Sequence, residues 1–151
     1  MGQWLAALIE PIRRADLTRP LTVGYDDLLL ASLPANAALD FISFHHYPPA
    51  DDAAPAFAAE LLTRLAARLG KPAILGEFGW STGEHAPGRV AALEAATFQE
   101  LRQRGLAGGL KWVLNDIADA GDAHEGGFGI FAADGSPKAS AEALRSVAAG
   151  G

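Results

Sequence analysis

The chain has 151 residues, half of them hydrophobic, and a formal net charge of −6. That length suits one domain with a real core, and the composition excludes a disordered chain. The acidic balance, without any run of lysine and arginine, disfavours nucleic acid and anionic membranes as partners. Cysteine is absent, which excludes disulfides and cysteine nucleophiles.

Targeting signals are not visible in the sequence. No apolar segment approaches the roughly 18 residues that a membrane-spanning helix needs. The first residues, Met1-Gly2-Gln3-Trp4, lack the basic and apolar regions of a signal peptide. We therefore expect a soluble chain, and the sequence leaves its compartment open.

Hydrophobic periodicity predicts helices and strands in alternation. The first half is expected to contain helix 3–15, strand 21–25, a short buried helical turn at 28–30, strand 39–47 and helix 53–69. A strand then begins at 73 and ends by presenting Glu77. It is followed by helix 88–104, strand 106–114, a polar loop to 135 and a final helix.

Capping residues define several of these ends. Asp52 is the expected N-cap of helix 53–69, and Gly70 its C-cap. Phe57 falls in the apolar 3.6-residue pattern of the same helix, so it is expected to face the core. The final helix is predicted to begin with Ser136 as N-cap and Pro137 at the first helical position.

The alternation indicates an α/β fold built from βα units around a parallel sheet, in one domain over residues 1–151. Glycine-rich phosphate-binding motifs are absent: residues 79–88 lack the Lys-Ser/Thr of a P-loop, and no G-x-G-x-x-G follows the first strand. A nucleotide-binding doubly wound fold is therefore disfavoured.

Residues suited to sugar binding gather where the predicted strands end, which is where parallel α/β folds bind ligands. Aromatic faces stack on a pyranose while amides, carboxylates and histidines bind its hydroxyls. Period-two alternation places His45 and Tyr47 on one face of their strand. The candidate site residues are Glu77, His45, Tyr47, Trp80, Trp112, Asn115 and Asp116.

Structural roles compete with this interpretation. Glu77 alone could be a turn residue after a core strand, and tryptophans at strand ends usually pack in cores. His124, with Asp119, Asp122 and Glu125, could suggest a metal site. Their spacing in a glycine-rich stretch instead favours a solvated loop. We expect neither a metal nor a cofactor.

Five segments together resemble the C-terminal half of clan A glycoside hydrolases, the (β/α)8-barrel enzymes that include cellulases, β-mannanases and β-glucosidases. Three of them resemble the sixth, seventh and eighth barrel strands of that clan, the opening segment resembles its fourth helix and fifth strand, and the last resembles its chain ending. The segments are 40–48, 71–79, 109–112, 19–24, and 128–131 with 134–138.

The resemblance implies a partial TIM barrel of about four βα units, corresponding to strands 5–8. It makes Glu77 the nucleophile of a retaining glycosidase, oriented by a hydrogen bond from Tyr47. His45, Trp80 and Trp112 would line the sugar subsite, with Asn115 or Asp116 at its edge. A β-linked oligo- or polysaccharide would be the substrate.

One departure from the clan limits this expectation. Retaining hydrolysis needs a second carboxyl group as acid/base, and the Asn-Glu pair that supplies it in the clan occurs nowhere in this sequence. We therefore expect a fragment that depends on a missing N-terminal half-barrel. Two alternatives stay open: a non-catalytic half-barrel that homodimerises and at most binds sugar, and an α/β protein whose Glu77 is structural.

Overall fold

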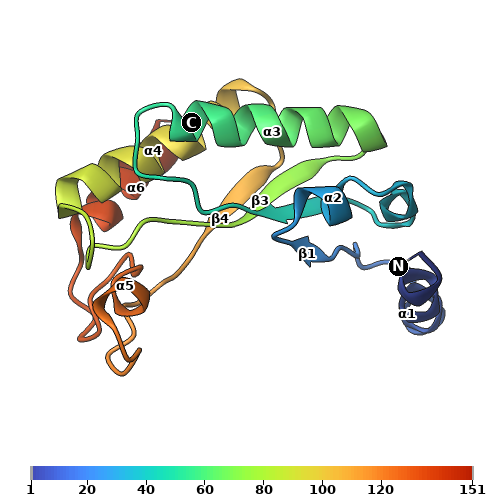
Figure 1. Ribbon diagram of the computed structural model, residues 1–151, viewed down its shortest axis with the longest axis horizontal. Coiled ribbons are helices and arrows are strands. Elements are labelled where there is room, and N and C mark those ends of the chain that lie inside the picture. Colours follow the sequence, from blue (N-terminus) through green and yellow to red (C-terminus); the bar gives the residue numbers. More distant parts are fainter. Residues whose placement is uncertain (1, 151) are drawn as a thin grey trace.

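The computed structural model describes residues 2–150 and contains a four-stranded sheet with helices around it (Figure 1). The elements in chain order are α1 Gly2–Ala15, β1 Gly24–Tyr25, α2 Leu28–Ala31, the 3-10 helix η1 Pro34–Ala38, β2 Ile42–His45, α3 Ala54–Leu69, β3 Ala73–Phe78, α4 Pro87–Gln103, β4 Gly108–Lys111, α5 Ala123–Gly126 and α6 Ala139–Ala149.

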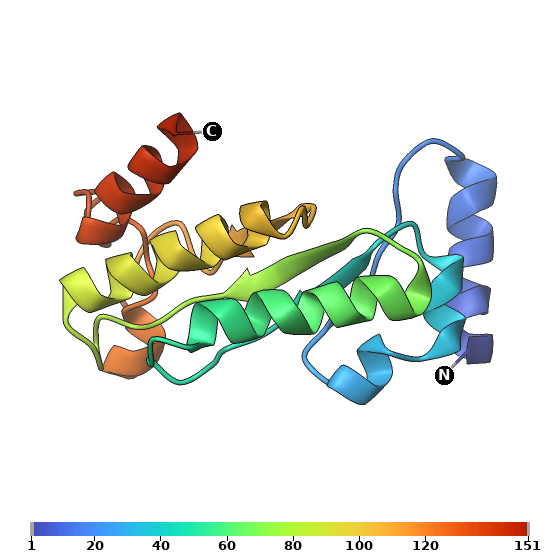
Figure 2. The same ribbon diagram turned by 90° about the horizontal axis from the view of Figure 1, so that it is seen from above.

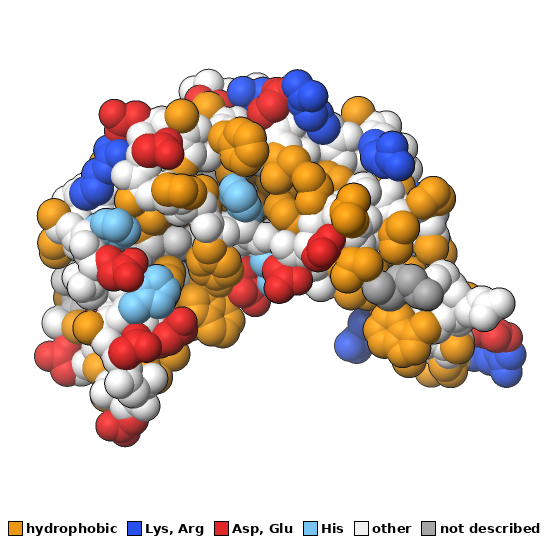
Figure 3. All heavy atoms as spheres, viewed as in Figure 1, with side chains coloured by type: hydrophobic (Ala, Val, Ile, Leu, Met, Phe, Trp, Pro, Cys, Tyr) orange, Lys and Arg blue, Asp and Glu red, His pale blue; other side chains and the backbone are white. Residues whose placement is uncertain are grey.

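The sheet is parallel throughout, in the order β1-β2-β3-β4. Helices α3 and α4 lie on one face, and α6 packs beside α4, away from α1 (Figure 2). The space-filling view shows an arch that is hollowed beneath the sheet (Figure 3). Sequential parallel strands joined by helices on one face are the arrangement of a (β/α)8 barrel, and the described residues form an open part of one.

The core lies between the sheet and the helices α3 and α4. Ile42, Phe44 and Leu75 on the strands are buried against Leu62 on α3 and Leu93 on α4. The predicted inner face of helix 88–104 is confirmed, because the structure buries all four of its members, Val90, Leu93, Thr97 and Leu101. This two-layer packing fixes the two central strands, β2 and β3, and thereby the side chains at their carboxyl ends.

The outer strands are shorter than the sequence predicts. Residues 24–25 alone pair as β1, and residues 108–111 alone as β4. Each has one neighbouring strand, so few backbone groups are paired. The central strand β2 is also shorter than predicted, at residues 42–45, whereas β3 covers residues 73–78 and is the longest of the four.

Two predicted helix starts were wrong, although the C-cap Gly70 is confirmed by its left-handed conformation (φ 61°). The Asp52 carboxylate pairs with Arg89 instead of capping α3. Helix α6 begins after an N-cap at Lys138, because the residues before it form short bridges with the loop that follows β4.

Several apolar side chains are exposed where the pattern predicts burial. On α1 only Leu5 is buried, whereas Trp4 is 56% exposed. Phe57 on α3 is also exposed, and of the predicted buried turn at 28–30 Leu28 and Leu29 are exposed while Leu30 packs partly buried against the core. These faces are hydrophobic without being covered by residues 2–150. Among the described helices, none is both long and apolar enough to cross a membrane.

Candidate active site

Glu77 lies near the carboxyl end of β3, between the buried side chains of Leu75 and Phe78. The pairing of β2 with β3 shifts by one residue after Phe44, so that His45 lies directly opposite Glu77. This irregularity places an imidazole and a carboxylate side by side at the end of the sheet. The Glu77 side chain is 31% exposed and therefore accessible to a ligand.

Two neighbours contact the same oxygen of Glu77. The Tyr47 hydroxyl donates a hydrogen bond to Oε2 at 2.9 Å, and His45 Nδ1 lies 3.5 Å from it. Burial, followed by the bond to Glu77, raises the pKa of Tyr47, so the phenol stays protonated and remains a donor at neutral pH. The hydrogen bond that the sequence analysis expected is present, and both contacts are made to Oε2.

Two glycines make room for His45. A Cβ atom at Gly24 on β1 would overlap the imidazole ring, and one at Gly76 on β3 would lie 3.0 Å from its Cδ2 atom. The strands on both sides of His45 therefore carry no side chain where the ring lies. This arrangement holds the imidazole beside Glu77 at the end of the sheet.

Glu77 forms part of the wall of a cavity of about 680 Å³. Tyr47 and Trp112 line this cavity and are 46% and 38% exposed, so both present aromatic surface to a ligand. Phe128 meets Tyr47 edge-on at a centroid distance of 5.9 Å. The complete lining is Tyr47, Pro48, Pro49, Ala50, Glu77, Gly79, Trp80, Ser81, Glu84, His85, Trp112, His124, Glu125 and Phe128.

Trp80 contributes to the wall from a buried position. Its side chain packs edge-on against Phe78, and its indole N–H donates to the Pro48 carbonyl at 2.9 Å. With 4% exposure it offers a ligand little surface. The structure thus assigns Trp80 to the support of the segment that follows Tyr47, while a direct sugar contact stays a prediction.

A buried lysine supports the two aromatic residues at the far side of the cavity. Lys111, at the end of β4, is 3% exposed and pairs with the fully buried Glu94 of α4 at 3.1 Å. Its ammonium group also donates to the carbonyls of Trp112 and Phe128. Burial lowers the pKa of Lys111 and raises that of Glu94, each opposed by its partner's charge.

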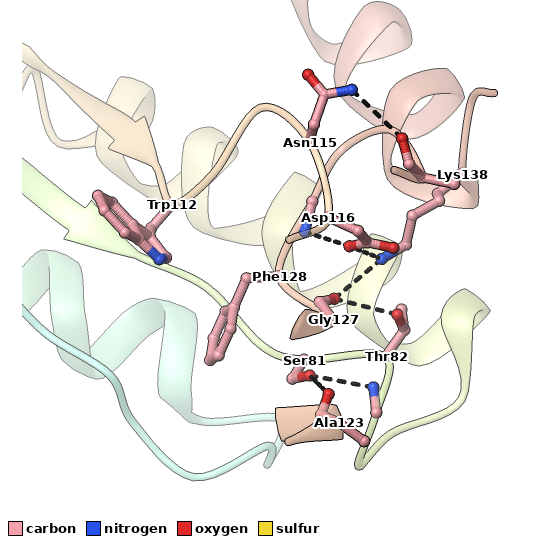
Figure 4. A network of polar contacts seen from close by, with 12 residues as sticks. Ser81, Thr82, Trp112, Asn115, Asp116, Ala123, Gly127, Phe128 and Lys138 are labelled. Carbon is pink, nitrogen blue, oxygen red and sulfur yellow. Dashed lines mark hydrogen bonds and ion pairs between the residues drawn. The ribbon is translucent and has the colours of Figure 1, made fainter. Parts of the chain in front are cut away.

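Asn115 and Asp116 do not line the cavity. The Asp116 carboxylate accepts hydrogen bonds from Lys138 Nζ and the Gly129 N–H, both at 2.7 Å, and the Asn115 amide donates to Ala132 at 3.3 Å (Figure 4). These bonds fix the loop after β4. The expected place of Asn115 and Asp116 at the sugar subsite is therefore not supported, because their polar groups bind the chain itself.

Four ionisable cavity residues were missed by the sequence analysis as site residues: Glu84, His85, His124 and Glu125. His124 and Glu125 belong to α5, a single helical turn with Asp122 as N-cap, and both side chains are exposed, as expected of a solvated stretch. No local sequence pattern could have identified these residues, because the segment that contacts α5, residues 81–82, lies about 40 residues earlier in the chain.

Hydrogen bonds join these two distant segments. The Thr82 hydroxyl donates to the Gly127 carbonyl at 3.1 Å, and the Ser81 hydroxyl donates to the Ala123 carbonyl at 3.3 Å (Figure 4). The Thr82 N–H donates to the same Gly127 carbonyl at 3.0 Å. Glu84 Oε2 then lies 3.0 Å from His124 Nδ1. Within residues 2–150, no three His, Asp or Glu side chains are grouped to hold a metal ion.

Comparisons with solved structures identify the architecture. The β-D-glucuronidase of Dictyoglomus thermophilum matches 97% of this chain with a TM-score of 0.79 and 18% identity. A glycoside hydrolase of GH5_18 from Streptomyces cattleya, in complex with Manβ1-4GlcNAc, matches 97% with a TM-score of 0.79 and 19% identity. The fold is a partial (β/α)8 barrel.

A third glycoside hydrolase supports the same conclusion. The family 17 β-1,3-glucanosyltransferase of Rhizomucor miehei matches 91% of the chain, with a TM-score of 0.71 and 20% identity. The chain spans 29%, 41% and 56% of the lengths of the three proteins. No protein-family model and no curated protein matches the sequence. The structural neighbours are thus glycoside hydrolases, and the likeness is one of fold.

Proposed function

We propose that this chain is the part of a retaining, clan A-like glycoside hydrolase that carries the catalytic nucleophile, Glu77. The observation that carries the proposal is the hydrogen bond from Tyr47 to Glu77 inside an aromatic-lined cavity at the carboxyl end of a parallel sheet. Catalytic residues of (β/α)8 barrels lie at that end of the sheet. The names of the structural neighbours are consistent with sugar chemistry.

In the proposed reaction, Glu77 Oε1 attacks the anomeric carbon of a β-glycoside while the bond to the leaving oxygen breaks. Tyr47 and His45 hold Oε2, so the carboxylate is oriented before attack. Water then hydrolyses the glycosyl-enzyme ester, which releases the sugar and restores the carboxylate. Trp112 offers the exposed ring face on which a sugar can stack.

A second carboxyl group is required to protonate a natural leaving group, at about 5–5.5 Å from the nucleophile. We propose that an N-terminal half-barrel supplies it, since three structural neighbours are longer barrels of which this chain spans 29–56%. The chain would then form strands 5–8, and the missing half would cover the exposed edges of β1 and β4.

The nucleophile can be tested without the acid/base residue. A 2-deoxy-2-fluoro β-glycoside with a 2,4-dinitrophenolate leaving group needs no protonation, and its glycosyl-enzyme ester hydrolyses slowly. Incubated with gluco-, manno- and galacto-configured reagents, the chain should gain the mass of one fluorosugar, mapped to Glu77 by peptide mass spectrometry. Glu77→Gln should stay unlabelled. Absence of label at Glu77 with all three reagents would refute the proposal.

A second candidate, the non-catalytic homodimer, is favoured by the two unpaired sheet edges and by exposed Leu110 and Leu114 at β4. Two copies would close an eight-stranded barrel, but their Glu77 residues would stand four strands apart, whereas clan A carboxylates stand three apart. Analytical ultracentrifugation separates the candidates: a chain that stays monomeric at high micromolar concentration excludes the homodimer.

A further inference from the structure

The permanently charged side chains that line the cavity are all carboxylates. Its lining contains the carboxylates of Glu77, Glu84 and Glu125 and the imidazoles of His85 and His124. Among residues 2–150, no lysine or arginine side chain belongs to that lining. A ligand in the cavity therefore faces carboxylates without a permanent positive charge to offset them.

The cations behind the cavity wall are already bound to carboxylates. Arg89, which also donates to the Ala50 carbonyl at 3.1 Å, pairs with Asp52. Lys111 is buried against Glu94. Lys138 is 13% exposed and bound to Asp116 at 2.7 Å. Because each ammonium or guanidinium group is engaged, none of these three is free to bind an anionic ligand.

Glu84 and Glu125, the two most exposed carboxylates of the lining and called the cavity mouth below, both lie near the imidazole of His124. His124 Nδ1 lies 3.0 Å from Glu84 Oε2, and its Nε2 lies 3.9 Å from Glu125 Oε1. His85 Nε2 also lies 3.9 Å from Glu84 Oε2, so imidazoles are the neighbours of both carboxylates. Both glutamates are about half exposed, with 51% and 60% of their side chains accessible, so their oxygens can reach a ligand.

The charge of Glu125 also acts on Tyr47, another residue of the cavity lining. The charge of Glu125 contributes to the raised pKa of Tyr47, the donor to Glu77. A ligand bound between Tyr47 and Glu125 thus lies between the Glu77 carboxylate and a second negative charge. Binding a sugar carboxylate here would place it beside the carboxylates of the cavity. The lining offers neither a bidentate arginine nor a lysine ammonium group, which normally bind a carboxylate.

From this arrangement we propose that the cavity selects sugars whose ring substituents are neutral or cationic, and that it discriminates against uronic acids. Amino sugars should bind at least as tightly as neutral hexoses, because an ammonium group can lie against Glu84 or Glu125. The inference rests on the proposed function, since it assumes that this cavity holds the sugar. It separates the chain from structural neighbours whose names specify glucuronides or galacturonides.

Three methyl β-glycosides test the proposal: the glucoside, the 2-amino-2-deoxyglucoside and the glucuronide. Each of the last two differs from the glucoside in one substituent, an ammonium group at C2 or a carboxylate at C6. Their dissociation constants are measured with the unmodified chain by ligand-observed NMR at low ionic strength. A unit charge at ~6 Å in a water-like medium changes affinity roughly threefold. With several carboxylates present, the glucuronide should bind about tenfold more weakly than the glucoside, and added salt should reduce the difference.

Removing charge at the mouth should weaken the discrimination. The double variant Glu84→Gln/Glu125→Gln should bind the glucuronide several-fold more tightly, so the ratio of the glucuronide to the glucoside dissociation constant should fall several-fold. Both side chains are exposed, so the substitutions leave the core intact. Glu10→Gln is the matched control, because it removes an exposed carboxylate on α1, at the end of the molecule away from α5 (Figure 1).

The outcomes separate the two proposals. Glucuronide binding as tight as glucoside binding would overturn the inference and leave the nucleophile proposal standing, as would discrimination that the double variant retains in full. Failure of all three glycosides to bind would overturn the inference, whereas the nucleophile proposal is decided separately by fluorosugar labelling of Glu77. Weaker binding of the amino sugar than of the glucoside would overturn the predicted preference for a cation.

Discussion

The buried pair of Lys111 and Glu94 provides the sharpest quantitative test of the structure. Lys111→Met would leave the Glu94 carboxylate, which is 0% exposed, without its cation. Removing one partner of a buried ion pair costs about 3–5 kcal/mol. The Trp112 carbonyl would also lose its donor, and the Phe128 carbonyl would keep only the Val113 N–H. Since domains of this size are stable by only about 5–15 kcal/mol, the variant should unfold at much lower urea concentration.

The pH dependence of this variant has a definite sign. Burial raises the pKa of Glu94, and Lys111 opposes that effect. Without Lys111 the folded-state pKa rises further above the unfolded value of about 4.5. A carboxyl group with a raised folded-state pKa stabilises the fold at low pH and loses that contribution as pH rises through the folded-state pKa. Lys111→Met should therefore regain part of its lost stability between pH 7 and pH 5.

Urea unfolding followed by circular dichroism measures both effects. The double variant Glu94→Leu/Lys111→Met removes both charges and should be more stable than the two single losses predict, with a coupling free energy of about 2 kcal/mol or more. A loss below about 1 kcal/mol for Lys111→Met at pH 7, or additive single losses, would refute the argument that the pair is buried and interdependent.

Three further substitutions probe the cavity. Tyr47→Phe removes a hydrogen bond to a carboxylate, worth about 1.5–3 kcal/mol, and should slow fluorosugar labelling of Glu77 about tenfold or more; an unchanged rate contradicts the orienting role. Gly24→Ala places a methyl group against the His45 ring and should cost about 1–3 kcal/mol of unfolding free energy, with native-like stability as the contrary result. Trp112→Ala should weaken glucoside binding about tenfold without changing urea stability by more than about 1 kcal/mol; equal affinity would exclude stacking.

Hydrophobic periodicity correctly predicted the helices and strands that pack at the centre of the fold. Helix 88–104 and the strand leading to Glu77 were located correctly, since both are packed on their apolar faces. Period-two alternation placed His45 and Tyr47 on one face, and both contact Glu77 Oε2. Local periodicity was therefore sufficient to predict which side chains meet at the carboxyl ends of β2 and β3.

The cavity mouth depends on pairing that no local pattern encodes. Glu84 and His124 come together because hydrogen bonds from Ser81 and Thr82 to the carbonyls of Ala123 and Gly127 join segments some 40 residues apart. Asn115 and Asp116 were expected to face the ligand, yet Lys138 and backbone groups bind them instead. A polar residue near a strand end predicts a site only when its partners are known, and those partners lie far along the chain.

The three tryptophans occupy three different environments: Trp4 is exposed on α1, Trp80 is buried behind the segment after Tyr47, and Trp112 faces the cavity. The molecule therefore contains three separate fluorescence reporters. In variants that retain one indole each, Trp4 would report the covering of α1 by another half-barrel, Trp80 the unfolding of the core, and Trp112 the arrival of a sugar. Assembly, stability and ligand binding can thus be observed separately in the same protein, without an attached dye.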